Sequence, residues 1–176
     1  MKAVRLTELG GPEKLRVEEI PDPKPGAGEA LVRIKRAALN RRDVFITQGL
    51  YPGIDLPKTL GSDGCGTVAQ YGDGAQGPKI GTRVVIDPTM TWGDDERVWR
   101  RDGGVLGMPV DGTFAEYVRV PAHNVHEAPE HLSDEEAAAI PLAGLTAYRA
   151  CFSRGDLTKD DVVLITGVGG GVQTFV

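Results

Sequence analysis

The chain has only two cysteines and three histidines among its 176 residues. Cys65 and Cys151 are too few for a disulfide framework or for a zinc site with four cysteine ligands. The three histidines have a spacing that fits neither one helix face nor a known zinc motif; they are His123, His126 and His131. The sequence therefore predicts reduced structural thiols, surface histidines and no metal site.

Long apolar runs and excess positive charge are also missing. No stretch of eighteen apolar residues occurs, so no membrane-spanning helix is expected. The N-terminus leads directly into a strand-like pattern and not into a signal peptide. A net charge of −5 and a pI near 5.2 argue against a nucleic-acid partner. Together with the reduced thiols, these features predict a cytoplasmic protein that binds neither membranes nor nucleic acid.

Glycine, in contrast, is abundant: its 24 residues are roughly twice the average usage of about 7%. Alternation of apolar and polar residues between glycine-rich turns is typical of short strands. The strands expected from it are Lys2–Thr7, Leu15–Glu19, Glu29–Leu39, Leu60–Ala69, Gly81–Ile86 and Gly112–Val120. We expect the segment Asp87–Pro109 to be a long irregular loop. The composition and the pattern predict a mostly β protein with some α-helix.

Capping signals mark where the helices begin. Asn40-x-x-Asp43 resembles a capping box and predicts a short helix that ends at Gly49. Ser133-x-x-Glu136 is a second capping box, and it precedes a run of alanines. Pro141 interrupts the pattern, and a further helix is expected over Leu145–Phe152. The change from strands to helices at Ser133 predicts a second structural unit, over residues 125–176.

The final stretch has the pattern of a dinucleotide-binding turn. Val162–Ile165 is a β-branched apolar run, which is typical of a buried parallel strand. A glycine cluster follows at once, where such a turn brings its backbone close to a pyrophosphate. The residues of this loop are Gly167, Gly169, Gly170, Gly171 and Val172. Val172 stands where the G-x-G-x-x-G pattern has glycine, so a tight glycine turn without a ligand is an equal alternative.

Several blocks, taken together, resemble the medium-chain dehydrogenase/reductase superfamily. They are Asn40–Asp43, Gly61–Val68, Gly81–Val84, Gly112–Val118, Pro141–Tyr148 and the glycine loop. Their order and spacing match along nearly the whole chain. The resemblance implies a GroES-like, partly open β-barrel that holds substrate, here residues 1–124. It also implies that residues 125–176 are a helical connector and the start of a Rossmann α/β domain, which binds NADPH or NADH in the full-length form.

The departures from this resemblance concern the metal. Zinc alcohol dehydrogenases have cysteine where this chain has Asn40, and histidine and glutamate where it has Ser62 and Asp63. An amide and a hydroxyl do not replace a thiolate and an imidazole around Zn²⁺. The segment that holds structural zinc in the family contains no cysteine here. The chain therefore resembles the zinc-free quinone oxidoreductases and enoyl reductases, and we expect Ser62 and Asp63 to form a hydrogen-bonded pair in the vacated polar pocket.

The resemblance assigns three further candidate residues. Tyr51 matches the tyrosine that similar enoyl reductases use as a proton donor, although a loop tyrosine can equally pack its ring over a cleft rim. Asn40 has an amide that could orient a substrate oxygen, and it could cap its helix at the same time. Thr146 matches the family threonine behind the nicotinamide ring, with an ordinary mid-helix threonine as the alternative.

The function implied is NAD(P)H-dependent, zinc-independent hydride transfer to a small molecule: a quinone, an enone or a related carbonyl compound. The given chain is then an N-terminal fragment of such an enzyme. Two alternatives stay open: a non-catalytic GroES-like domain or interrupted gene product, and a zinc-containing alcohol dehydrogenase homologue. Without neighbouring strands, Val162–Ile165 would expose apolar faces and both edges. We therefore expect either disorder from Asp161 onward or a homodimer formed through this strand, and weak NADPH binding by the isolated chain.

Overall fold

The structure, a computed structural model, describes residues 1–93, 95, 97–100 and 103–176. The strands are β1 (Lys2–Leu6), β2 (Leu15–Glu19), β3 (Glu29–Ala38), β4 (Lys58–Thr59), β5 (Asp63–Tyr71), β6 (Arg83–Ile86), β7 (Thr89–Met90), β8 (Gly104–Leu106), β9 (Pro109–Val110), β10 (Tyr117–Pro121) and β11 (Val125–Glu127). The α-helices are α1 (Arg41–Thr47), α2 (Asp134–Ala138) and α3 (Pro141–Tyr148). Short 3-10 turns lie at Pro12–Lys14 and Ala122–Asn124, and a π-helical segment, Arg149–Arg154, continues α3. The predicted mostly β class with some helix is confirmed.

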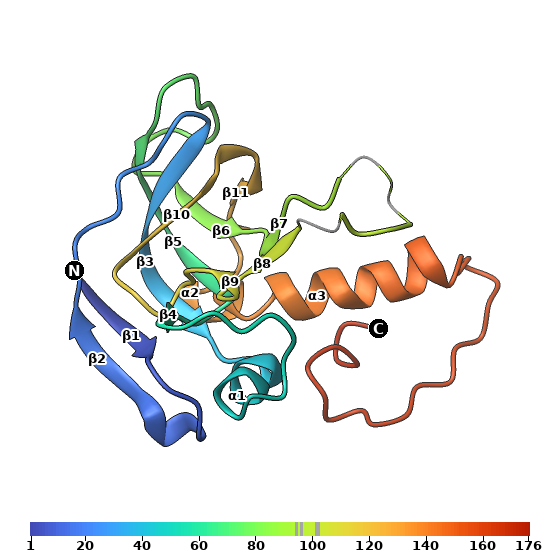
Figure 1. Cartoon of the computed structure of the whole chain (residues 1–176). Coiled ribbons are helices and arrows are strands. Elements are labelled where there is room, and N and C mark those ends of the chain that lie inside the picture. Colours follow the sequence, from blue (N-terminus) through green and yellow to red (C-terminus); the bar gives the residue numbers. More distant parts are fainter. Residues whose placement is uncertain (94, 96, 101–102) are drawn as a thin grey trace.

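The main sheet has five antiparallel strands in the order β10-β3-β5-β6-β11, and it curves around one core (Figure 1). The alternation in β3 explains which face is inside, because Ala30 and Val32 are fully buried whereas Arg33 and Lys35 are exposed. The first two strands pair with each other, with Leu6 opposite Leu15. The strand β11 is the edge strand beside β6. Residues just beyond position 124 therefore pair with the barrel.

A second apolar cluster lies between α1 and the small sheet β2-β1-β4. Its buried members are Leu6, Ile46, Leu60 and Met108, with Tyr51 and Phe114 packed against them in partly buried positions. This cluster joins the start of the chain to α1 and to the segment after β8. It is the surface on which the first candidate site residue, Tyr51, rests.

The helix starts follow the capping signals. Ser133 and Glu136 form the predicted box: the Glu136 N–H donates to Ser133 Oγ at 3.2 Å, and the Ser133 N–H donates to Glu136 Oε2 at 2.8 Å. The next helix begins at Pro141, earlier than the predicted Leu145, because proline is well suited to a first helical turn. No helix in the described ranges has the length and apolar character needed to cross a bilayer.

The segment predicted to be an irregular loop, Asp87–Pro109, contains a small sheet in the order β7-β8-β9. Two tryptophans of this segment, Trp92 and Trp99, stack with their ring centroids 5.6 Å apart and their planes 2° from parallel. The Arg149 guanidinium lies over the Trp92 ring at 4.0 Å from its centroid. The aromatic stack thus lies within the segment, and the cation–π contact connects Trp92 to the end of α3.

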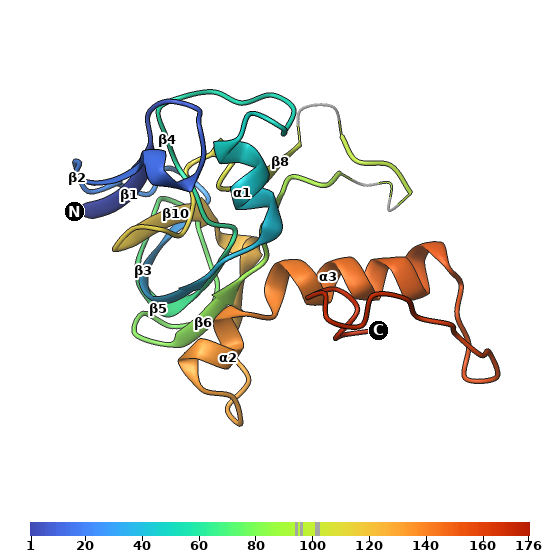
Figure 2. The ribbon, with the colours of Figure 1, turned by 90° about the horizontal axis from the view of Figure 1, so that it is seen from below.

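The predicted strand at Val162–Ile165 is wrong. Residues 161–167 have no regular secondary structure, and the Val162 and Leu164 side chains are 99% and 91% exposed. A parallel strand needs neighbours that satisfy its backbone groups, and no described strand pairs with this segment. The stretch from 161 to the end instead returns beside α3 (Figure 2). Self-association through this segment stays a prediction, although the strand on which that prediction was based is not formed.

The close approach of β3 and β5 generates a stability prediction. A Cβ atom on Gly66 would lie 2.0 Å from the Arg33 carbonyl oxygen, so Gly66→Ala forces the two strands apart. We expect it to lower the free energy of unfolding by about 3 kcal/mol. Gly169→Ala is the matched control, because nothing lies within 4 Å of its added methyl group. Urea unfolding of both variants checks this, and equal midpoints would contradict it.

Candidate functional site

The Asp63 carboxylate lies at the start of β5 and is 1% exposed. Its Oδ2 accepts a hydrogen bond from Asn40 Nδ2 at 2.8 Å, and its Oδ1 accepts one from the Leu142 backbone N–H at 2.7 Å. The Thr113 hydroxyl donates to the Asp63 carbonyl oxygen at 2.7 Å. One buried side chain therefore connects the barrel strand, the residue that precedes α1 and the first turn of α3.

Burial is the main influence on this carboxylate. It raises the pKa of Asp63 from its ordinary 3.8 to about 6, because charge is disfavoured away from water. The donors from Asn40 and Leu142 oppose that rise, and the neighbouring Asp43 carboxylate adds to it. Burial also raises the pKa of Asp43, which is 5% exposed. The site thus holds two buried carboxyl groups whose charged forms are both disfavoured.

Asn40 occupies the predicted N-cap position, but its side chain makes no capping hydrogen bond. The Asn40 N–H donates to Asp43 Oδ2 at 2.8 Å, and the Asp43 N–H donates to the Asn40 carbonyl oxygen at 3.0 Å. The Asn40 side chain reaches away from its helix to Asp63. One amide proton is used in that bond, so the second proton and the amide oxygen are what Asn40 can offer a ligand. A role in orienting substrate stays a prediction.

The Arg42 guanidinium is a charged group of this site that sequence reasoning missed. Its Nη1 donates to Ser62 Oγ at 2.5 Å and to the Leu106 carbonyl at 2.9 Å, and its Nη2 donates to the Met108 carbonyl at 3.2 Å. Its Cζ atom lies 4.8 Å from the centroid of the Tyr51 ring. No local motif could have indicated this arrangement, because its partners are up to 66 positions away along the chain.

The expected hydrogen-bonded pair of Ser62 and Asp63 is wrong. Ser62 donates its hydroxyl proton to the Leu106 carbonyl at 2.8 Å and accepts from Arg42, whereas Asp63 accepts from Asn40 and Leu142. Adjacent residues of an extended backbone point to opposite sides, which separates their partners. Ser62 and Asp63, which stand where zinc relatives have metal ligands, therefore belong to two separate hydrogen-bond networks.

The Tyr51 ring is packed against other side chains, whereas its hydroxyl is available for a hydrogen bond. Its ring is partly buried against the cluster of Leu6, Ile46, Leu60 and Met108, beneath the Arg42 guanidinium. Its hydroxyl makes no hydrogen bond with the part of the chain that the structure describes. The packing interpretation thus describes the ring, and the proton-donor role of the free hydroxyl stays a prediction.

The residues predicted to bind the cofactor gather near α3. Thr146 is exposed, and its hydroxyl donates to the Leu142 carbonyl one turn earlier at 2.7 Å, as in an ordinary helical threonine. Gly167 has a φ of +74°, which favours glycine, and Gly171 lies against Ala143 of α3. Methyl groups added at Gly167 or Gly169 would meet nothing within 4 Å. The loop is therefore open to a ligand on one side, and Val172 lies in the turns that follow it.

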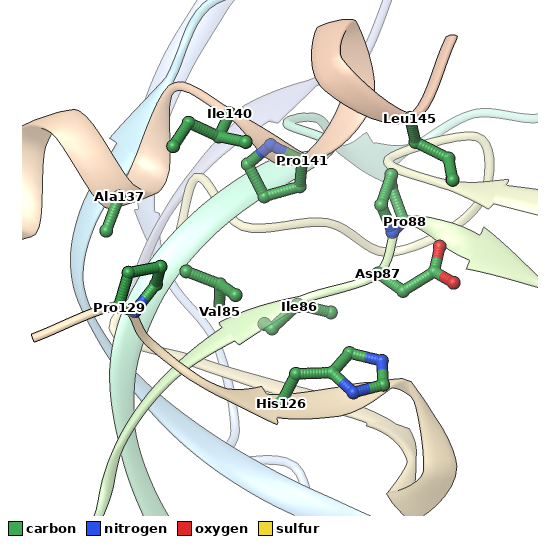
Figure 3. Close-up of a pocket in the computed structure, with 10 residues that line it drawn as sticks. All are labelled: Val85, Ile86, Asp87, Pro88, His126, Pro129, Ala137, Ile140, Pro141 and Leu145. Atoms are coloured by element: carbon green, nitrogen blue, oxygen red, sulfur yellow. The ribbon is translucent and has the colours of Figure 1, made fainter. Parts of the chain in front are cut away.

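An apolar pocket of about 260 Å³ lies between the β6–β11 edge and the α2–α3 region (Figure 3). Eight of its lining residues are apolar, and Asp87 and His126 are the polar ones. No group of three or more His, Cys, Asp or Glu residues that could hold a metal occurs among the described residues. His126 therefore lines an apolar pocket, and it does not form a metal cluster with His123 and His131.

The raised pKa of Asp63 predicts how stability depends on pH. Asp63 has a higher pKa in the folded chain, about 6, than in the unfolded chain, near 4. Its contribution to the free energy of unfolding is therefore fully present below pH 4 and is lost as the pH rises through about 6. Asp63→Asn removes this dependence while keeping an acceptor for the Leu142 N–H. We expect the free energy of unfolding of the variant, relative to wild type, to rise by up to about 3 kcal/mol between pH 4 and pH 7.

Urea unfolding at four pH values between 4 and 7 measures this difference. Asp55→Asn is the control for the general loss of one negative charge, because the Asp55 side chain is 79% exposed. A difference between Asp63→Asn and wild type that stays constant over this range would contradict the prediction.

Comparison with known proteins identifies the family. Residues 26–130 match the alcohol dehydrogenase GroES-like domain. A zinc-type alcohol dehydrogenase-like protein of Schizosaccharomyces pombe is 38% identical over 96% of this chain and 49% of its own length. The acryloyl-coenzyme A reductase of Sulfurisphaera tokodaii is 33% identical over 98% and 53%, and the human quinone oxidoreductase is 32% identical over 98% and 47%. The chain thus spans about half the length of the curated relatives it matches.

A solved structure of an NAD-dependent alcohol dehydrogenase superposes with a TM-score of 0.92 at 41% identity, over 99% of this chain and 53% of that one. The expected GroES-like barrel is therefore confirmed. By its domain match and its structural neighbours, the chain belongs to the alcohol dehydrogenase GroES-like family within the medium-chain dehydrogenase/reductase superfamily of oxidoreductases.

Proposed function

We propose that this chain provides the substrate-binding part of an NAD(P)H-dependent oxidoreductase that reduces a quinone, an enone or a related carbonyl compound without zinc. The names of its relatives support the reaction class, since an acryloyl-coenzyme A reductase and a quinone oxidoreductase are among them. Both named substrates contain a polarised conjugated system, which accepts hydride at carbon and develops negative charge on oxygen. The domain boundary near position 124 and the cofactor role of the glycine loop belong to this proposal.

The observation that carries the proposal is the network at positions 40, 62 and 63. Asn40 and Asp63 are hydrogen-bonded to each other, and Ser62 is bonded to the Arg42 cation. A guanidinium at this place repels a divalent metal ion, and an amide and a hydroxyl are poor zinc ligands. The chemistry of these side chains thus favours a site in which hydrogen bonds take the place of the metal.

The nicotinamide cofactor would supply the hydride. The residues that fit it are Thr146, whose oxygen keeps free lone pairs, and the glycine loop, whose open side leaves room for a pyrophosphate. The Gly169 and Gly171 amides donate no hydrogen bond within the described ranges, so they are available to an anion. Because Asp63 fastens the first turn of α3, the barrel controls where Thr146 stands relative to the substrate side.

The chain's own residues would orient the acceptor and supply a proton. The second amide proton of Asn40 can be donated to a carbonyl oxygen of the substrate, since Asp63 holds the amide in one orientation. Tyr51 offers a hydroxyl without a hydrogen-bond partner among the described residues, at the edge of the same site, as a general acid requires. Hydride arrival at one atom and proton delivery to another complete the reduction.

Zinc independence is tested by metal analysis. The full-length protein, purified from zinc-supplemented medium and dialysed extensively, should contain less than about 0.1 zinc per chain because positions 40 and 62 lack thiolate and imidazole. Elemental analysis by mass spectrometry measures this. A content near one zinc per chain would favour the zinc alcohol dehydrogenase alternative.

The proton-donor role is tested by Tyr51→Phe in the full-length protein. We expect kcat and kcat/KM for an enone to fall together by about 100-fold, because a donor used in the transition state is lost. The affinity for NADPH should stay unchanged. Tyr117→Phe, on β10 outside the site, is the matched control. Wild-type kcat in the Tyr51→Phe variant would mean that Tyr51 only packs.

A further inference from the structure

Arg42 is a partly buried residue of the site that the proposed reaction does not yet use. It lies in the first turn of α1, between the capping residue Asn40 and the buried Asp43. The Leu106 and Met108 carbonyls and the Ser62 hydroxyl hold its two terminal nitrogens. Its Nε is buried and has no hydrogen-bond partner among the described residues. These three hydrogen bonds to one planar guanidinium group give it a defined position.

The hydrogen-bond acceptors of Arg42 are neutral groups, so they do not neutralise its positive charge. No carboxylate in the described ranges lies within ion-pair distance of Arg42, although Asp43 and Asp63 are near enough to interact with it through space. Carbonyl and hydroxyl groups orient a guanidinium without cancelling its charge. A full positive charge is therefore presented to the face of the Tyr51 ring, 4.8 Å from its centroid.

The Tyr51 ring is fixed between this charge and an apolar surface. Leu6, Ile46, Leu60 and Met108 pack around it, and the guanidinium covers it. Its hydroxyl is the part of the side chain without a partner in the described ranges. The site thus immobilises the phenol and leaves its acidic proton free.

We propose that Arg42 is a positioning residue for Tyr51, holding the phenol ring in place and stabilising the phenolate that forms when Tyr51 gives up its proton. The inference rests on the proposed function. Bound NAD(P)H would supply the hydride to one atom of the acceptor and become NAD(P)⁺, so the acceptor would gain two electrons. The Tyr51 O–H bond breaks as the proton moves to the atom of the acceptor that develops negative charge. The phenolate left beside Arg42 then takes a proton from water.

A double-mutant cycle in the full-length protein tests this. Arg42→Met removes the charge and the fork but keeps much of the bulk, and Tyr51→Phe removes only the hydroxyl while the ring stays. We expect Arg42→Met to lower kcat for an enone by about 30-fold when Tyr51 is present, and by less than about threefold when combined with Tyr51→Phe. KM for NADPH should not change. Arg42→Lys, which keeps the charge but not the fork, should recover part of the loss.

Arg41→Met is the matched control, because Arg41 is the exposed neighbour on the same helix turn, and it should leave kcat unchanged. Equal losses from Arg42→Met in both backgrounds would overturn the inference, since a merely structural arginine acts whether or not the hydroxyl is present. If Arg42→Met does not fold, Arg42→Lys is compared in both backgrounds with the same criterion. If the wild type shows no turnover, the proposed function is wrong and this inference is wrong with it. If the enzyme is active but the effects of Arg42→Met and Tyr51→Phe on kcat are additive, only the inference is wrong.

Discussion

The Asp63 carboxylate holds the candidate site together, and it forms no ion pair with the part of the chain that the structure describes. It is buried, and two N–H donors, from Asn40 and from the first turn of α3, take the place of a salt bridge. Burying a carboxylate is unfavourable unless hydrogen bonds compensate, so both donors must stay in place for the charged form to persist. This one group therefore connects the Asn40 amide to the first turn of α3, the helix that carries Thr146.

Local patterns predicted most of the barrel. The alternation in Glu29–Leu39 gave β3 within one residue, because each side chain's exposure there is decided by the pleat. The boxes at Asn40 and Ser133 gave the starts of α1 and α2, because a cap is satisfied within one helical turn. Tyr51 and Asn40 were found through the resemblance to a family, and the structure gives their contacts without testing their roles.

Non-local contacts could not be predicted. Leu142 reaches Asp63 from 79 positions away, and Arg42 finds its carbonyl partners in a segment that was expected to be irregular. Neither contact has a signature in spacing, since it exists only once the barrel has closed. The strand expected at Val162–Ile165 is wrong for the opposite reason. Its residues have strong β propensity, but no strand in the described part of the chain pairs with it, and propensity alone forms no strand.

The stacked tryptophans have an optical consequence. Trp92 and Trp99 are the two tryptophans of the chain, and both lie in the segment between β7 and β8. A neighbouring ring and a cation, here Arg149, change the emission of an indole. Tryptophan emission of this protein therefore reports directly on whether Trp92 is seated against Arg149 at the end of α3. Melting followed by emission and melting followed by far-ultraviolet circular dichroism observe two different events in this molecule.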